Sequence, residues 1–284
     1  MLKSNHATLF ALESSPEQAK TVIFGAPYDC TTSFRPGARF GPAAMRSESF
    51  GLESYSPYQD KDLFDYEICD AGDLELPFGG PEQALVLIEE QAEILFAAGK
   101  RPFMLGGEHL VTLAPVRAAL RHHPDLCIIH FDAHTDLREE YLGQPLSHAT
   151  VMRRCWDLVG DGRIFQFGIR SGLRDEFYWA REHTHLQKHN FGGVEDALAQ
   201  IGDRPIYFTI DLDVLDPSVF PGTGTPEAGG VTFPQLLEAM EKVCKGNVIG
   251  CDLVELSPNY DHSGMSTAVA CKILRELLLA LEKE

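Results

Sequence analysis

The sequence predicts an α/β protein built on a doubly wound, mostly parallel β-sheet. Two observations predict this class. Six short segments are apolar without interruption, which is typical of parallel strands that are covered on both faces. Segments with helical periodicity lie between them. An alternation of strands and helices along a chain is characteristic of one sheet with helices packed on both of its sides.

The six predicted strands are spread over the chain from its first tenth to its last. They are residues 21–27 (TVIFGAP), 102–107 (PFMLGG), 126–133 (LCIIHFDA), 163–170 (RIFQFGIR), 206–213 (IYFTIDLD) and 248–256 (VIGCDLVEL).

Three segments between and after these strands have clear helix signals. Residues 81–100 carry Pro81 at the start and Gly99 as a stop signal, which is the usual asymmetry of helix ends. Residues 232–246 open with Thr232 and Pro234 and close at Gly246. Residues 266–284 form the last predicted helix.

Composition limits the possible function. The chain has 284 residues, 44% of them hydrophobic and 23% charged, which is ordinary for a soluble globular protein of one large or two small domains. A formal net charge of -18 argues against nucleic acid or an anionic membrane as a partner. It favours cationic substrates, although an acidic surface also serves solubility alone.

The sequence also predicts a cytoplasmic location. The N-terminus has neither the basic start nor the apolar stretch of a secretory signal, and no apolar run approaches the ~20 residues that span a bilayer. None of the seven cysteines is arranged as CxxC. Cys127, Cys251 and Cys271 have apolar neighbours and are predicted to be reduced core residues.

Residues that can bind metal follow four of the predicted strands. They are found in GGEH (106–109), DAHTD (132–136), DLD (211–213) and at Glu255. In open parallel sheets ligands bind beyond the carboxyl ends of the strands, so the four segments are expected to meet at one edge.

The spacing within these segments predicts a site for two cations. Asp132, His134 and Asp136 are two residues apart and share one side of an extended backbone, as do Asp211 and Asp213. Together with His109, which follows a small Gly-Gly turn, they offer four carboxylates and two imidazoles. This set suits two divalent cations ~3.5–4 Å apart with bridging carboxylates. Ligation without thiolate favours manganese over zinc.

The other histidines are given no role in metal binding. His130 is predicted to be a hydrogen-bonded core residue, although it shares the spacing of Asp132. His122 and His123 lie near a predicted helix end. His183, His185 and His189 lie in a polar stretch that is expected to be solvated.

The motifs GGEH, FDAHTD, TIDLDVLDP, PGTGTPEAGG and DLVEL, with SFRPGARFGPAAMR near the start, resemble those of the ureohydrolases, which include agmatinases and arginases. The resemblance covers nearly the whole chain and is closest to bacterial agmatinases. It implies that residues 1–284 form a single ureohydrolase domain with a three-layer α-β-α, arginase-like fold, assembled as a homotrimer or homohexamer. It also implies one manganese on His109, Asp132, Asp136 and Asp211, and a second on Asp132, His134, Asp211 and Asp213.

The resemblance further implies the catalytic residues. Hydroxide bridging the two ions would attack the guanidinium carbon, and Asp136 would orient it and relay its proton to the leaving amine. Glu255 matches the glutamate that binds the guanidinium group through paired hydrogen bonds. His148 in SHAT matches the histidine of a mobile loop and is a plausible proton shuttle.

The segment LREEYLGQPLSHAT (137–150) lacks the elements with which arginases hold the α-carboxylate and α-amine of arginine, and this favours agmatine as the substrate and putrescine and urea as products. Glu139 would attract a terminal ammonium if it faced the site. Arg138 leaves a guanidino acid open, and aminopropyl-agmatine and arginine remain alternatives. Two other classes are a single-zinc deacetylase relative and a non-catalytic metal-binding protein, both disfavoured because every ligand of both ions is present.

Overall fold

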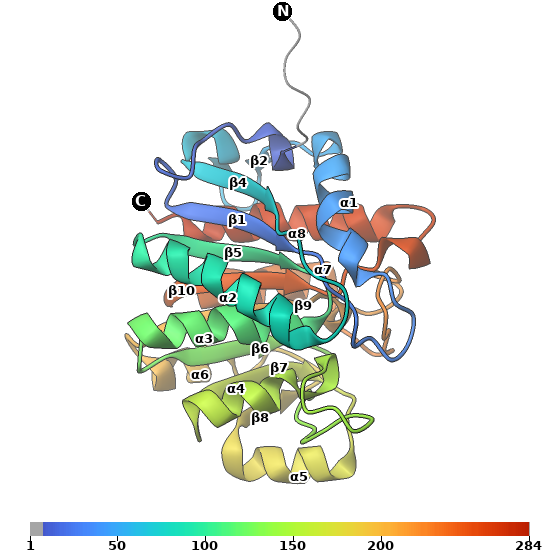
Figure 1. Cartoon of the computed structure of the whole chain (residues 1–284). Helices are drawn as coiled ribbons and strands as arrows, with labels where there is room; N and C mark the ends of the chain where they lie inside the picture. The colour runs from blue at the N-terminus through green and yellow to red at the C-terminus, as the bar shows by residue number, and fades with distance from the viewer. Residues whose placement is uncertain (1–7, 284) are drawn as a thin grey trace, which may run out of the picture.

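The computed structural model describes residues 8–283, and its centre is an eight-stranded sheet (Figure 1). Neighbouring strands are parallel throughout, in the order β4-β1-β5-β10-β9-β6-β7-β8. The strands of the sheet are β1 (Thr21–Ala26), β4 (Ile68–Asp73), β5 (Arg101–Gly106), β6 (Cys127–Phe131), β7 (Ile164–Ile169), β8 (His185–Lys188), β9 (Pro205–Asp211) and β10 (Asn247–Val254). A separate antiparallel pair is formed by β2 (Tyr55–Ser56) and β3 (Lys61–Asp62).

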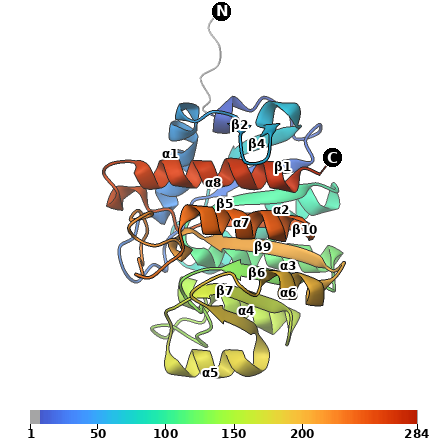
Figure 2. The same ribbon diagram turned by 180° about the vertical axis from the view of Figure 1, so that it is seen from behind.

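Helices cover both faces of this sheet. The helices are α1 (Gly41–Glu48), α2 (Pro81–Ala97), α3 (Leu113–His122), α4 (Val151–Val159), α5 (Arg174–His183), α6 (Val194–Ile201), α7 (Phe233–Cys244) and α8 (Met265–Leu281). Helices α2, α3 and α4 lie on the face seen in Figure 1, and α6, α7 and α8 lie on the face seen in Figure 2. The three-layer α-β-α fold with a mostly parallel sheet is therefore confirmed.

The six predicted strands correspond to β1, β5, β6, β7, β9 and β10, and the three predicted helices to α2, α7 and α8. Strands β4 and β8, which are the two edges of the sheet, were not predicted. Both contain polar residues, as in CDAGD and HLQK. An edge strand is paired with a neighbouring strand on one side only, so it need not be continuously apolar. His185, expected in a solvated stretch, is exposed but begins β8, and its ring stacks on that of Phe165 at 4.5 Å between centroids.

Apolar side chains fill the space on both sides of the sheet. Along β6 and β9, Ile129 and Phe208 belong to the core on one face, while Ile128 and Tyr207 belong to the core on the other. This explains why the strands are continuously apolar. Cys127, Cys251 and Cys271 are buried and free, as predicted. In residues 8–283 no helix combines the length and apolarity that crossing a membrane requires.

The strand order brings the predicted site segments together at the centre of the sheet. Strands β5, β10, β9 and β6 are consecutive neighbours. Their register pairs Leu253 with Leu105, Val254 with Asp211, and Ile210 with Phe131. All four strands therefore end at the same level, and the residues that follow them meet beyond that edge.

Candidate metal centre

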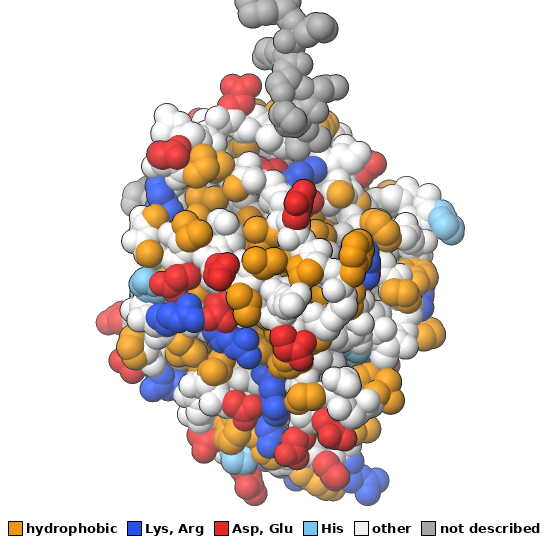
Figure 3. All heavy atoms as spheres, in the orientation of Figure 1, with side chains coloured by type: hydrophobic (Ala, Val, Ile, Leu, Met, Phe, Trp, Pro, Cys, Tyr) orange, Lys and Arg blue, Asp and Glu red, His pale blue; other side chains and the backbone are white. Residues whose placement is uncertain are grey.

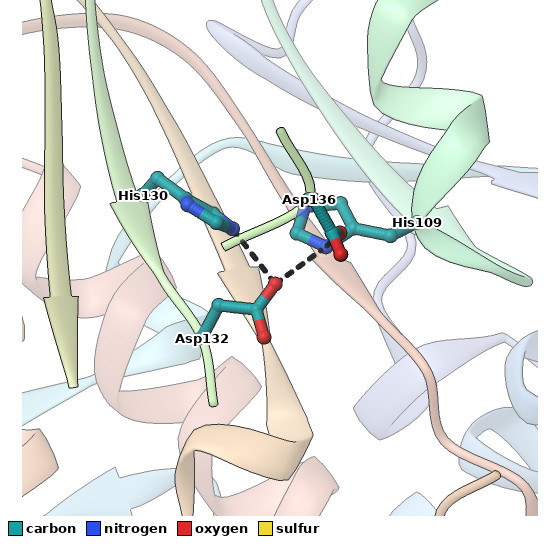
Figure 4. Close-up of side chains that lie close together, drawn as sticks. All are labelled: His109, His130, Asp132 and Asp136. Carbon is teal, nitrogen blue, oxygen red and sulfur yellow. Dashed lines mark hydrogen bonds and ion pairs between the residues drawn. The ribbon is translucent and has the colours of Figure 1, made fainter. Parts of the chain in front are cut away.

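The first group of predicted ligands surrounds one ring nitrogen of His109. Its Nδ1 lies 3.1 Å from Asp132 Oδ2, 3.2 Å from Asp211 Oδ2 and 3.4 Å from Asp136 Oδ2. Figure 4 shows His109, Asp132 and Asp136 converging on one point. These are the four residues that the resemblance assigns to the first ion.

The second group lies on the other side of Asp132. His134 Nδ1 is 3.4 Å from Asp132 Oδ1 and 3.0 Å from Asp213 Oδ2. Asp132 thus presents one carboxylate oxygen to each histidine, as a bridging ligand would. Asp211 connects to this group through its Oδ1, which accepts a hydrogen bond of 2.8 Å from the Asp213 N–H.

The turn before His109 requires glycine because another part of the backbone crosses it. A Cβ atom on Gly107 would lie 1.9 Å from the carbonyl oxygen of Tyr28, and one on Gly106 would lie 2.5 Å from Val254 Cγ1. The absence of a side chain at Gly107 therefore allows the backbone at Tyr28 to approach the turn closely. The turn delivers His109 to the first residue of a short 3-10 helix, His109–Thr112.

The electrostatics of the group favour a bound cation. Burial lowers the pKa of His109, but the hydrogen bonds and charges of Asp132 and Asp211 outweigh it and raise that pKa well above its usual value. Burial and the neighbouring carboxylates raise the pKa of Asp136 and of Asp211. His109 Nδ1 is buried and faces these carboxylate oxygens. A divalent cation at this point would be bound by the Nδ1 lone pair and would neutralise the carboxylates, which otherwise repel one another. The donor atoms are nitrogen and oxygen only.

His130 lies within reach of the first group, yet both of its ring nitrogens already have hydrogen-bond partners. Its Nε2 is 2.8 Å from Asp132 Oδ2, a contact drawn in Figure 4, and its Nδ1 is 3.0 Å from Gln166 Nε2. The Gln166 amide oxygen accepts a hydrogen bond from Thr184, so its NH₂ group faces His130. His130 therefore accepts at Nδ1 and donates from Nε2. It is a buried, hydrogen-bonded residue, as predicted, and it orients Asp132.

A cavity of about 250 Å³ opens above both groups. Seven of the ten predicted site residues line it, and Tyr141 lies beside them: the seven are His109, His134, Asp136, Arg138, His148, Asp211 and Glu255. Asp132 and Asp213 lie beneath this surface, 0% and 1% exposed. Glu139 is on the exposed surface and does not line the cavity, so the structure does not bring it together with the other residues.

Glu255 and Asp136 reach the cavity from an unusual backbone conformation. Their φ angles are +67° and +51°, in the left-handed region that is costly for residues other than glycine. Glu255 Oε1 accepts a hydrogen bond of 2.8 Å from the His109 N–H. Burial, and then the charge of Glu108, raise the pKa of Glu255 to about 8.

His148 contacts Thr31, which no sequence motif included, and Ser33, the first residue of SFRPGARFGPAAMR. Its N–H donates to Thr31 Oγ1 at 3.1 Å, and its Nε2 lies 3.4 Å from Ser33 Oγ. Thr31 Oγ1 in turn donates to the buried carboxylate of Glu108 at 2.5 Å. Burial lowers the pKa of His148 to about 4, and its Nδ1 is buried without a partner.

Arg138 lines the cavity, but its charge is already matched. Its guanidinium carbon lies 4.3 Å from the centroid of the Tyr141 ring, and its Nε is 3.7 Å from Glu176 Oε2. Glu176 is buried and also accepts hydrogen bonds from Thr135 Oγ1 and from the Leu137 N–H. No sequence motif pointed to Glu176, which lies 38 positions beyond Arg138, in helix α5.

The family model described as "Arginase family" matches residues 19–280. The chain belongs to the arginase family. Its arginase-family relatives include an agmatinase of Bacillus subtilis (strain 168), 48% identical over 271 residues that cover 94% of this chain and 93% of that protein. A human mitochondrial guanidino acid hydrolase is 38% identical over 286 residues, covering 96% of this chain and 81% of that protein.

Solved structures of the arginase family have the same fold. The crystal structure of the agmatine ureohydrolase of Thermoplasma volcanium superposes with a TM-score of 0.90 at 32% identity, covering 98% of this chain and 95% of that one. The chain is therefore an enzyme of the ureohydrolase type, a hydrolase. A non-catalytic metal-binding protein and a single-zinc deacetylase are accordingly set aside.

Proposed function

We propose that this enzyme hydrolyses agmatine to putrescine and urea. One observation carries the proposal: the carboxylate of Glu255 lines the same cavity as members of both metal-binding groups. Its Oε1 is held by the His109 N–H, while Oε2 accepts no hydrogen bond among the described residues. A free carboxylate oxygen beside the metal groups can pair with a planar guanidinium and bring its carbon to the reacting position. The 48% identical agmatinase supports the same substrate.

Two manganese ions are proposed as the cofactors. His109, Asp132, Asp136 and Asp211 would hold the first, and Asp132, His134, Asp211 and Asp213 the second. When bound, such a pair lowers the pKa of water so that hydroxide is available near neutral pH. The four carboxylates carry four negative charges, which two divalent cations neutralise, and this explains why so many acids tolerate burial.

The proposed roles of the protein residues follow from their positions in the cavity. Asp136 lies at its surface and can accept the proton of the attacking water and pass it to the leaving amine. Glu255 keeps the guanidinium plane fixed during attack. His148, with its pKa at about 4, is neutral at the working pH and can accept a proton during product formation.

The charges near the cavity mouth favour agmatine over substrates that carry a carboxylate. Among residues 8–283, Arg138 is the only Lys or Arg that lines the cavity, and its Nε lies 3.7 Å from Glu176 Oε2. A substrate carboxylate would have to compete with Glu176 and be placed near its charge. A terminal ammonium meets no such repulsion. A buried charge without a partner costs more than the ~1–3 kcal/mol of a neutral group.

A guanidino acid is the second candidate, and Arg138 is the observation that favours it. If the Arg138 side chain released Glu176 it could receive a carboxylate. The 38% identical human relative is named as a guanidino acid hydrolase. Aminopropyl-agmatine and arginine are the remaining alternatives.

Urea release from manganese-loaded protein tests the proposal. Agmatine, 4-guanidinobutyrate and arginine would be compared at equal concentrations, with metal-free protein as the control. We expect agmatine to exceed arginine in kcat/KM by at least ~10²-fold, the discrimination expected from a mismatched buried polar group. Faster hydrolysis of guanidinobutyrate would transfer the assignment to the acid, and faster hydrolysis of arginine would make the protein an arginase.

A cytoplasmic homotrimer or homohexamer with one domain per chain completes the proposal. All seven cysteines are free, which suits a reducing compartment. Apolar side chains are exposed on helix α2, at Val86, Leu87 and Ile94, and Figure 3 shows hydrophobic atoms scattered over the face on which α2 lies. Light scattering of the purified protein would give the number of chains per particle.

A further inference from the structure

A line of buried polar groups runs from His109 into the core, away from the cavity. His109 Nε2 is 2.9 Å from Thr209 Oγ1. Thr209 Oγ1 lies 2.6 Å from Asp252 Oδ1, and the hydroxyl of Tyr207 lies 2.8 Å from Asp252 Oδ2. Each of these four side chains is at most 1% exposed. Nothing in the proposed chemistry so far uses Thr209, Asp252 or Tyr207.

The sheet register explains why the line is continuous. Thr209 and Asp252 are directly paired across the neighbouring strands β9 and β10, so their side chains lie on the same face. Tyr207 precedes Thr209 by two positions and shares that face. His109 comes down onto Thr209 from the end of β5, the strand on the other side of β10.

The direction of the hydrogen bonds determines which nitrogen of His109 is protonated. A carboxylate accepts only, so Asp252 takes hydrogen bonds from both Tyr207 and Thr209. A threonine hydroxyl has one hydrogen, and Thr209 gives it to Asp252. The contact between Thr209 and His109 therefore requires the hydrogen of His109 Nε2. Nδ1 is then the nitrogen with a free lone pair, and it is the atom that faces Asp132, Asp136 and Asp211.

We propose that Thr209 and Asp252 are positioning residues that hold His109 with its Nδ1 lone pair directed at the first metal ion. The proposal rests on the proposed metal centre and adds residues that touch neither metal nor substrate. A metal-binding histidine is commonly oriented by a carboxylate on its other nitrogen, and here a threonine hydroxyl lies between the two. Replacing Thr209 by valine keeps the shape of the side chain but leaves the buried His109 Nε2–H without an acceptor.

The second histidine of the centre offers an internal comparison. His134 binds on the far side of Asp132 and is 24% exposed at its side chain, and the line through Thr209 does not reach it. Loss of the Thr209 hydroxyl should therefore weaken one ion and spare the other. A general loss of stability would weaken both.

Thr209→Val is the test variant, and Thr21→Val is its matched control. Thr21 is likewise a fully buried strand threonine that donates to a carboxylate, Glu282 Oε1 at 2.9 Å. It begins β1, at the edge of the sheet opposite to the carboxyl ends that carry the metal-binding groups. Thr209→Ser restores the hydroxyl. Each metal-free protein would be titrated with Mn²⁺, and free Mn²⁺ would be followed by electron paramagnetic resonance, with the bound metal counted by elemental analysis.

We expect Thr209→Val to bind one of its two ions ~10–100-fold more weakly, with the second within about three-fold of the parent. Thr209→Ser and Thr21→Val should both bind like the parent. If Thr209→Val bound both ions as tightly as the parent, or bound both more weakly to the same extent, the proposed positioning role of Thr209 and Asp252 would be wrong. If the parent itself failed to bind two ions, the proposed metal centre would be wrong. That outcome differs from one in which the parent binds two ions and Thr209 has no effect on them.

Should Thr209→Val not fold, Asp252→Asn provides a second measurement. It keeps the volume of the side chain and leaves Thr209 unchanged. An Asn amide can donate to Thr209, and the Thr209 hydroxyl is then free to donate to His109 Nε2. That reversal places the proton of the neutral ring on Nδ1, so we again expect selective weakening of one ion by about ten-fold or more. Unchanged binding of both ions in Asp252→Asn would contradict the proposed positioning of His109 by Thr209 and Asp252.

Discussion

The floor and the rim of the cavity are built in different ways. The floor consists of residues at the ends of the central strands β5, β6, β9 and β10, and Asp132, Asp213 and His109 are at most 1% exposed there. The rim consists of loop residues such as Arg138, Tyr141 and Leu173, the last of them 53% exposed. Sheet register determines the floor, whereas loops determine the rim. Metal binding should therefore depend on the floor, and substrate choice and turnover on the rim.

A change in the floor should have the largest effect. In His109→Ala one ligand of the first ion is lost while the fold remains, so we expect one ion per chain instead of two. We also expect kcat/KM for agmatine to fall by more than the ~10²–10⁴-fold that a general acid–base group contributes. His122→Ala is the control, because His122 is paired with Glu93 at the end of α3, outside the cavity. Two ions per chain in His109→Ala would contradict the assignment of the floor.

A change in the rim should separate turnover from metal binding. In His148→Ala we expect both ions to stay bound while kcat falls ~10²–10⁴-fold, because the lost imidazole moves protons but holds no metal. The measurements are metal content and urea release on the same sample. Activity within a few-fold of the parent would remove His148 from the proposed mechanism.

Thr31, which holds the rim residue His148 in place, should contribute less to turnover than His148 itself. Thr31→Val removes the hydroxyl that accepts from the His148 N–H and donates to Glu108. One hydrogen bond contributes ~0.5–1.5 kcal/mol net, so we expect kcat to fall roughly 2–10-fold with both ions bound. Thr31→Ser keeps the hydroxyl and should restore activity. A loss of metal in Thr31→Val would show that floor and rim are not independent.

The smallest effect concerns the stability of the metal-free protein. The pKa of Glu255 is about 8 in the folded state, against a usual 4.5, because burial and Glu108 disfavour its charge. A raised carboxyl pKa gives a contribution to stability that is complete below about pH 4.5 and is lost as pH rises through about 8. Glu255→Gln cannot ionise. Its Tm should therefore rise relative to that of the metal-free parent as pH increases over this window, and a constant Tm difference would contradict the shift.

Much of the floor could be predicted from the sequence, because it depends on rules that act locally. Continuous apolarity predicted the central strands, and charged residues directly after them predicted the proposed metal ligands. The edges β4 and β8 could not be recognised in this way, since ICDAGD and HLQK lack the apolar run of a covered strand. The composition of an edge strand depends on what lies beside it in the fold.

The supporting residues were missed for a related reason. Thr31 and Glu108 are 77 positions apart, and Thr209 and Asp252 are 43 apart, so their contacts arise only when strands take their places. Asp252 did carry a signal, because a charged residue within CDLV must be paired if the strand is buried. Glu139 was wrongly placed at the cavity for a different reason. Its charge suited a cationic substrate, but the charge of a loop residue does not determine the direction of its side chain, and Glu139 is exposed outside the cavity.

The left-handed backbone at Asp136 and Glu255 has a consequence for engineering. Either residue replaced by glycine would relieve an unfavourable φ angle and remove a buried carboxyl group whose pKa is raised. Such variants would lack groups proposed for metal binding and chemistry, yet without metal they are candidates for higher thermal stability. A selection of metal-free protein for heat resistance alone, without an assay of urea release, would then enrich variants with glycine at these two positions. Under the proposed mechanism those variants would be inactive.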